Sequence, residues 1–162
     1  MGVAVGVAVL THLLSTSPEA APNYINLEQL DCMAKNIYFE ARNEATVGQL
    51  AVAQTVINRV ESTRFPNTIC GVVQQGLHSK SGFPLRDRCH FSWYCDGYHD
   101  EPKKASRSWA RSVELAQIMI INKNWMIDVI DGATHYHADY VDPKWNRKKR
   151  MVVRIGSHLF YR

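Results

Sequence analysis

The sequence lacks several features that define whole classes of protein. After residue 22 it has no apolar run long enough to cross a bilayer, and it has no internal repeat, heptad pattern or low-complexity tract. These absences argue against a membrane-spanning domain, a solenoid and a coiled coil. The chain has 162 residues, 46% hydrophobic and 21% charged. That composition is typical of one soluble globular domain.

Positive charge is missing from the N-terminal region, where the first basic residue is Lys35. The run Val3–Leu14 is largely apolar, and residues 15–22 are small, polar and proline-containing. Such a stretch is similar to the hydrophobic core and cleavage zone of a secretory signal without its basic end. We predict an export leader or hydrophobic anchor over residues 1–24, in preference to a flexible extension, and a single domain over residues 25–162.

The four cysteines include no Cys-x-x-Cys pair. In an exported chain an even number of cysteines predicts one or two disulfides, with three possible pairings if all four are used. Cys89 and Cys95 are near enough in sequence to close a small loop. The alternative is a cytosolic protein with four reduced, buried thiols. The four are Cys32, Cys70, Cys89 and Cys95.

Metal-binding motifs are scarce as well. His135 and His137 alternate in a predicted strand and so point the same way. However, no His-Glu-x-x-His motif or Cys/His cluster supplies a third ligand. We therefore predict no metal and no other cofactor.

Basic residues gather near the C-terminus. The stretch 140–162 contains one acid, Asp142, and seven basic residues: Lys144, Arg147, Lys148, Lys149, Arg150, Arg154 and Arg162. Such a cluster attracts a polyanion, whether nucleic acid, anionic lipid or an anionic cell wall. A solvated basic loop is the alternative.

Helical periodicity dominates the secondary-structure signal. Asn26, with Gln29 three residues later, forms a capping box at the start of the first helix. Apolar spacing predicts helices over residues 27–43, 46–60, 68–75 and 106–122. Residues 76–104 are predicted to be mostly loop with one or two extended pieces, and residues 133–138 are expected to pair with 151–161 as a hairpin. The predicted fold class is α+β, mainly helical, with a small antiparallel β element.

Glu40 is the strongest candidate for chemistry. It lies near the C-terminal end of the first predicted helix among Tyr38, Phe39 and Ala41, and both apolar neighbours and the negative helix end raise a carboxyl pKa. Glu44 follows one turn later, roughly 5–6 Å away if the helix continues. Because both carboxylates project from the same side, they do not flank a glycosidic bond as a catalytic pair does. Glu44 is predicted to orient or tune Glu40; a solvated helix end is the alternative for both.

Ordered sequence blocks resemble the SleB/CwlJ-type cell-wall hydrolases, spore-cortex lytic enzymes with phage and proteobacterial relatives. Tyr38–Glu44 is similar to the signature Y-x-E-A-R-G-E of that family. Further blocks follow in order. Gly48 begins a block similar to G-Q-x-A-V-A…N-R-V, Phe65 one similar to F-P-x-T-x-C-x-V-V-x-Q, and Phe91 one similar to F-S-W. Three blocks similar to the C-terminal motifs of the family begin at Ala133, Pro143 and Ile155. The resemblance extends from about Leu30 to Tyr161.

The resemblance implies a lysozyme-like domain, similar to lytic transglycosylases and resuscitation-promoting factors. These enzymes cleave the β-1,4 bond between N-acetylmuramic acid and N-acetylglucosamine in peptidoglycan. One glutamate protonates the leaving oxygen and then takes the proton of the muramoyl 6-hydroxyl, which yields a 1,6-anhydro product. The signature assigns this role to Glu40.

The same resemblance sets the expected surroundings of the protein. We expect a monomer in the periplasm or cell wall, or one encoded by a phage and released to the wall. Its partner is the glycan strand of peptidoglycan; nucleic acid is not a partner, and a membrane is met only through an N-terminal anchor.

Two positions depart from the family pattern. Asn43 stands where the family has Gly, so we expect a left-handed residue there, a conformation that Asn tolerates. His90 replaces the Gln before Phe91, which puts the role of that amide in doubt.

Sugar recognition needs aromatic platforms and hydrogen-bonding groups. The candidate platforms are Phe91, Trp93, Tyr136 and Trp145. The candidate hydrogen-bonding residues are Gln49, Gln74, Ser92, Thr134 and His137. Packing in the core is the alternative for each aromatic residue.

Three rival functions follow from the same sequence. An amidase that cuts between muramic acid and the stem peptide relies on a zinc-activated water. A non-catalytic wall-binding module, or a nucleic-acid binder, would use the basic C-terminal stretch, and its binding would weaken with salt.

Overall fold

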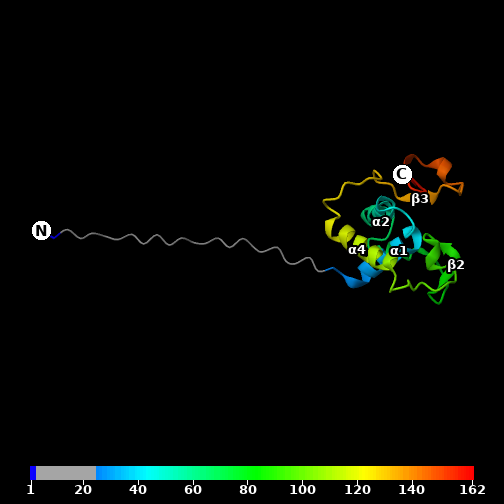
Figure 1. Ribbon diagram of the computed structural model, residues 1–162, viewed down its shortest axis with the longest axis horizontal. Helices are drawn as coiled ribbons and strands as arrows, with labels where there is room; N and C mark the ends of the chain where they lie inside the picture. Colours follow the sequence, from blue (N-terminus) through cyan, green and yellow to red (C-terminus); the bar gives the residue numbers. More distant parts are fainter. Residues whose placement is uncertain (3–24) are drawn as a thin grey trace.

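The computed structural model describes residues 1–2 and 25–162, so the predicted leader lies outside the described residues. No helix in the described part is long and apolar enough to span a membrane. The elements, in chain order, are α1 (Leu27–Ala41), α2 (Thr46–Glu61), α3 (Ile69–Val73), β1 (Gly76–His78), β2 (Pro84–Cys89), the 3-10 turn η1 (Ser92–Tyr94), α4 (Arg107–Asn122), β3 (His135–Ala138), η2 (Asn146–Lys148), β4 (Met151–Ile155) and β5 (His158–Tyr161). Figure 1 shows the helices together, with both sheets to one side of them.

The start of α1 is set by its cap. The Asn26 Oδ1 accepts hydrogen bonds from the backbone N–H of Glu28, at 2.9 Å, and of Gln29, at 3.2 Å, as the capping pattern predicts. The Gln29 side chain does not return the bond, because its Oε1 accepts from the N–H of Cys70 at 3.0 Å. Together with the Cys32–Cys70 disulfide, this contact ties α1 to α3.

The core lies where α1 packs against α2, α3 and α4. Its largest fully buried side chains include Met33, Ile37, Val56, Leu115 and Met119. Each such side chain stabilises the fold by roughly 1.5–3 kcal/mol relative to exposure. Helix α1, the carrier of Glu40, is therefore covered on three sides.

The small sheets differ in detail from the prediction. The stretch 151–161 is not one strand but a hairpin of β4 and β5, which turns at Gly156 with a φ of 58°. Strand β3 pairs antiparallel with β5, and Tyr136 lies opposite Phe160. The predicted loop region contains the β1–β2 hairpin, whose end is closed by the Cys89–Cys95 disulfide.

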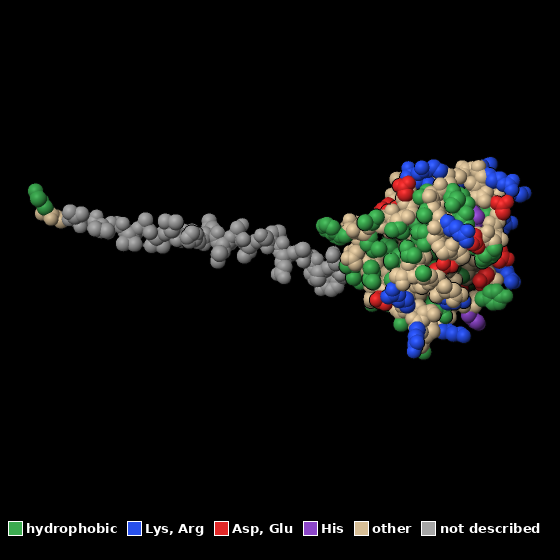
Figure 2. Space-filling model, turned by 45° about the horizontal axis from the view of Figure 1, so that its top comes forward, with side chains coloured by type: hydrophobic (Ala, Val, Ile, Leu, Met, Phe, Trp, Pro, Cys, Tyr) green, Lys and Arg blue, Asp and Glu red, His purple; other side chains and the backbone are tan. Residues whose placement is uncertain are grey.

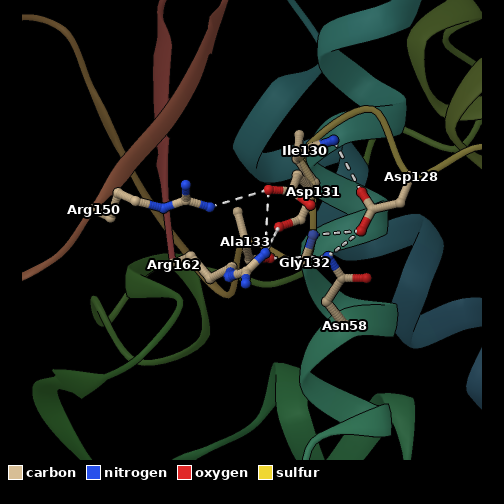
Figure 3. Close-up of polar contacts among 8 residues, drawn as sticks. All are labelled: Asn58, Asp128, Ile130, Asp131, Gly132, Ala133, Arg150 and Arg162. Atoms are coloured by element: carbon tan, nitrogen blue, oxygen red, sulfur yellow. Dashed lines mark hydrogen bonds and ion pairs between the residues drawn. The ribbon is translucent and has the colours of Figure 1, made fainter.

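A polar network holds the loop that leads into β3 (Figure 3). The Nδ2 of Asn58, on α2, donates to the Asp128 carboxylate and to the carbonyl of Ala133, both at 3.1 Å. Asp131 pairs with Arg150 and Arg162, each at 3.2 Å. Since these contacts join α2, the loop and the chain end, they position β3 against the helices.

The C-terminal basic stretch is largely neutralised. Its four arginines pair with three aspartates: Arg147 with Asp142, Arg154 with Asp139, and both Arg150 and Arg162 with Asp131. On the face drawn in Figure 2, acidic and basic side chains alternate, and no broad basic surface forms. The lysines of the stretch are therefore its remaining source of positive charge.

Candidate active site

Three adjoining pockets form one groove along the protein. The central pocket, of about 550 Å³, is lined by the end of α1, residues 90–96, β3 and its following loop. The Glu44 pocket, of about 270 Å³, adjoins it and shares Glu40. On the other side lies the Trp145 pocket, of about 420 Å³, which shares Arg59, His90 and Tyr136 with the central pocket. The groove therefore runs past Glu40 in both directions.

Glu40 has the surroundings expected of an acid. Burial raises its pKa above the ordinary value, against the opposing effects of a hydrogen bond from Tyr136 and the charge of Arg59. The Tyr136 hydroxyl donates to Glu40 Oε2 at 2.8 Å. The apolar surroundings predicted from Tyr38, Phe39 and Ala41 thus raise the pKa in the expected direction.

Tyr136 reaches Glu40 from β3, 96 residues later in the chain. Its ring packs between His158 and Phe160, at centroid distances of 5.1 and 5.5 Å. Burial, followed by the nearby Glu40 carboxylate, raises the pKa of the phenol well above its usual range. Tyr136 therefore stays protonated and acts as a hydrogen-bond donor.

Arg59, on α2, is a site residue that reasoning from sequence missed. Its Nε donates to the carbonyl of Thr134 at 2.7 Å, and its guanidinium lies 4.9 Å from the Phe91 ring centre and 5.3 Å from that of Phe65. Burial lowers its pKa, although Tyr136 and Glu40 act in the opposite direction. The sequence signal for Arg59 was a charged residue that lies between Ile57 and Val60, two apolar residues of the second predicted helix.

Glu44 makes its contacts away from Glu40. Its carboxylate accepts hydrogen bonds from the hydroxyl and the backbone N–H of Ser157, and it lies 3.9 Å from His158 Nδ1. The hydroxyl of Ser157 is the main cause that lowers the pKa of Glu44. Glu44 therefore joins the α1–α2 connection to the β4–β5 turn, and its predicted support of Glu40 stays a prediction.

A second carboxylate, Asp96, lines the central pocket with Glu40. Its Oδ1 accepts from the backbone N–H of Tyr98 at 2.8 Å, which fixes the orientation of the carboxylate. Nothing in the local sequence around Asp96 distinguishes it from an ordinary loop aspartate.

The predicted sugar contacts divide into two groups. The central pocket is lined by Phe91, Ser92, Trp93, Tyr136 and His137, and the Trp145 pocket by Trp145 and Tyr136. The other three lie elsewhere: Thr134 lines a separate pocket with Arg64, the Gln49 amide donates to the carbonyl of Glu44 at 2.8 Å, and Gln74 is exposed. Whether the groove residues bind sugar stays a prediction.

Two of the proposed platforms are mostly covered. Phe91 is 2% exposed and Trp93 is 8% exposed. Trp93 stacks on Phe39 with ring centres 4.8 Å apart, and its indole N–H donates to Asn36 Oδ1 at 3.1 Å. These two rings form the wall of the groove, so Tyr136 and Trp145, which are partly exposed, offer more surface to a ligand.

The two departures from the family pattern have different outcomes. The expectation of a left-handed Asn43 is wrong, because Asp87 and Asp131 are the non-glycine residues with positive φ in the described part. The turn is closed instead by a hydrogen bond from the N–H of Glu44 to the carbonyl of Ala41 at 2.9 Å. His90 lies in both the central and the Trp145 pockets, and burial lowers its pKa.

The paired histidines do not converge on one point. His135 lines the Trp145 pocket, whereas His137 lines the central pocket. The His137 ring lies within hydrogen-bond distance of the Tyr161 hydroxyl and of the Ala138 carbonyl, each at 2.9 Å. Across residues 25–162, no three His, Cys, Asp or Glu side chains group as metal ligands.

Comparison with known proteins identifies relatives of this chain. The family model described as Cell Wall Hydrolase matches residues 43–161. The spore cortex-lytic enzyme of Bacillus cereus is 30% identical over 141 residues, which are 86% of this chain and 46% of that protein. The spore cortex-lytic enzyme of Oceanobacillus iheyensis is 40% identical over 140 residues, 86% of this chain and 43% of that protein. The chain thus spans less than half the length of these curated relatives.

Solved structures give the same relation. The catalytic domain of the germination-specific lytic transglycosylase SleB from Bacillus anthracis is 27% identical, with a TM-score of 0.62 over 87% of this chain and 99% of that one. The catalytic domain of the Bacillus cereus SleB protein is 26% identical, with a TM-score of 0.55 over 87% of this chain and 94% of that one. With its lysozyme-like fold and its match over residues 43–161, this chain belongs to the cell wall hydrolase family.

Proposed function

We propose that this protein cleaves the β-1,4 bond between N-acetylmuramic acid and N-acetylglucosamine in peptidoglycan, as a lytic transglycosylase with Glu40 as its acid and base. The observation that carries the proposal is a half-buried carboxyl on the wall of a long groove, whose pKa is raised by its burial. A groove open on both sides of the acid suits a polymer that extends past the cleaved bond.

In the first step neutral Glu40 donates its proton to the glycosidic oxygen. Because Tyr136 already donates to Oε2, the proton of the neutral acid belongs on Oε1, the other oxygen. As the C1–O bond of muramic acid breaks, Glu40 becomes a carboxylate. The hydrogen bond from Tyr136 and the positive charge of Arg59 both favour this charged form, so they lower the cost of a charge formed in a buried site.

In the second step the Glu40 carboxylate accepts the proton of the muramoyl 6-hydroxyl, and that oxygen bonds to C1. The product is a 1,6-anhydro sugar, and Glu40 returns to its neutral form. No water is consumed, and one residue serves as acid and then as base.

The test is digestion of purified peptidoglycan followed by mass spectrometry of the products. Terminal muramic acid should lack one water. Glu40→Gln should form the products at least about 10²-fold more slowly, while the exposed Glu61→Gln variant should form them at the rate of the wild type. Free stem peptides and sensitivity to EDTA would identify an amidase instead. Unchanged wall binding without any cleavage would identify a non-catalytic module.

Hydrolysis of the same bond is a second candidate, because Asp96 lies in the central pocket with Glu40. A second carboxylate can activate a water that attacks C1. Under the transglycosylase proposal, Asp96→Asn should still form anhydro products at a rate within about threefold of the wild type. If Asp96→Asn loses activity and the products of the wild type contain an added water, hydrolysis is favoured instead.

We also propose that the protein acts outside the cytoplasm, where its substrate is. The two disulfides, Cys32–Cys70 and Cys89–Cys95, support this location because such bonds persist in oxidising compartments. The apolar, signal-like stretch Val3–Leu14 supports it from the sequence.

A further inference from the structure

Cleavage at Glu40 uses the charge of Arg59 but does not explain the second basic residue of the Trp145 pocket. The lining of this pocket consists of Arg59, His90, His135, Tyr136, Trp145 and Lys149. Two of these side chains are permanent cations at neutral pH, and none is a carboxylate. A pocket for a neutral sugar alone would not require this excess of positive charge.

Arg59 is the buried component of that charge. It is 6% exposed, and its Nη1 is buried without a hydrogen-bond partner. Within residues 25–162 no carboxylate oxygen lies within 4.0 Å of its guanidinium, the distance that defines the ion pairs of this protein. A buried cation without a counterion is costly, so the guanidinium that lines this pocket is not fully compensated by the protein.

Glu40 does not fill this need through an ion pair. No ion pair joins Glu40 and Arg59 in the described structure, and burial raises the pKa of Glu40, which disfavours its charged form. The charge of Arg59 is therefore available to a ligand in the groove.

Lys149 adds a second cation at the rim. The neighbouring Arg147 and Arg150 are held by Asp142 and Asp131, whereas Lys149 makes no ion pair in the described structure and lines the pocket. The histidines add no charge near neutral pH, because burial, followed by the charge of Lys149, lowers the pKa of His135 to about 4.

We propose that the Trp145 pocket binds a carboxylate of the substrate through Arg59 and Lys149, beside the sugar that lies against Trp145. In a peptidoglycan strand this group is the lactyl carboxylate of a muramic acid without peptide, or a carboxylate of the peptide that muramic acid carries. The inference rests on the proposed function, and it adds that the protein selects among glycan strands by the negative charge on muramic acid. Charged pairs of this kind favour the correct ligand and penalise its neutral analogue.

The experiment compares strands that differ in that charge alone. Peptide-free glycan strands with free lactyl carboxylates are divided in two, and one half is converted to the neutral N-methylamide; peptide-bearing strands are treated in the same way. The wild type should cleave the neutral strands with kcat/KM at least tenfold lower than the charged ones. A difference between the charged and neutral peptide-free strands would identify the lactyl group as the source of the carboxylate. A difference only between the charged and neutral peptide-bearing strands would identify the peptide.

Variants assign the preference to the pocket. Lys149→Met should raise KM for charged strands by about tenfold, so that the difference between charged and neutral strands largely disappears. The matched control is Lys148→Met, which replaces an adjacent exposed lysine outside the pocket and should behave as the wild type. Arg59→Gln should also lose the preference for charged strands. Because Arg59 is buried, the Lys149 variant provides the test if the Arg59 variant does not fold.

Two results overturn the inference. If the wild type cleaves charged and neutral strands equally, the carboxylate site is refuted while the proposed cleavage stands. If no strand is cleaved, the proposed function fails, and calorimetric titration of the Glu40→Gln protein with the two kinds of strand then decides binding separately. Equal affinity for both kinds would refute the site there too.

Discussion

Replacement of Tyr136 by phenylalanine tests the chemistry of Glu40 directly. The variant keeps the ring between His158 and Phe160 and removes the hydroxyl that donates to Glu40 Oε2 at 2.8 Å. That bond lowers the pKa of Glu40 against the effect of burial. Without it, the pKa of Glu40 should rise further.

The size of the change follows from the strength of the bond. A hydrogen bond to a charged group contributes roughly 1.5–3 kcal/mol, and a difference of one in pKa corresponds to about 1.4 kcal/mol. The pKa of Glu40 should therefore rise by about one to two. Since the first step needs the neutral acid, activity in the wild type is lost as pH rises through that pKa.

The measurement is kcat/KM against pH with peptidoglycan strands as substrate. In Tyr136→Phe the alkaline limb should move to higher pH by about one to two, and the rate at the optimum should fall by about tenfold or more because the carboxylate formed in the first step is less stable. The control, Tyr98→Phe, changes an exposed tyrosine outside the groove and should leave the limb in place. An unchanged limb, or one moved to lower pH, would refute the assignment of Glu40 as the acid.

Four further predictions concern stability, and the first of them concerns activity as well. Glu40→Gln should reduce the cleavage rate by about 10²- to 10⁴-fold. The variant should nevertheless have a higher Tm than the wild type above pH 5, because the pKa of Glu40 is raised and the wild type therefore loses stability as the pH rises through that pKa. An equal or lower Tm of the variant at neutral pH would contradict this explanation. Glu44→Gln should lower the free energy of unfolding by about 1–3 kcal/mol at neutral pH, as measured in urea. The difference from the wild type should vanish as the pH falls below the lowered pKa of Glu44. A loss of stability that does not depend on pH would argue against the Ser157 contacts. Gly156→Ala should destabilise the protein by a similar or larger amount, since Gly156 has a φ of 58° and an added Cβ would overlap the Glu44 carboxylate. The control is Gly82→Ala, where the glycine also has a positive φ but an added Cβ meets open space. The difference between the two variants measures the effect of the overlap apart from backbone strain. Reduction of the Cys32–Cys70 disulfide, which closes 38 residues, should lower the free energy of unfolding by roughly 4 kcal/mol, as measured by urea unfolding of a Cys32→Ser/Cys70→Ser protein.

The helices were predictable because their signals are local. Asn26, Thr68 and Ser106 cap α1, α3 and α4 with their own side chains, and a cap acts within three residues of itself. The apolar stripes then identified core residues such as Ile37 and Ile57. The strands were less predictable: residues 151–161 divide into two strands because Gly156 turns the chain, and alternation alone does not reveal a turn.

The raised pKa of Glu40 was also predictable, but the groups that contact this side chain were not. Glu40 could be recognised from its place near a helix end among apolar neighbours, and from the family signature. Its hydrogen bond comes from Tyr136, 96 residues away, and Glu44 turns to Ser157, 113 residues away. Sequence spacing is informative about neighbours within a helical turn and is silent about contacts at such separations.

The amino-acid sequence by itself determined the family and the helical framework and indicated one candidate acid, because caps, periodicity and a contiguous signature act over short stretches of chain. Only the tertiary structure decided which groups face that acid: it brought Arg59 from α2 and Tyr136 from β3 to the same groove, left Nη1 of Arg59 without an acceptor, and neutralised the C-terminal arginines with nearby aspartates. The reason is physical. Burial and charge at a site depend on every side chain packed around it, and packing joins residues that are distant in sequence.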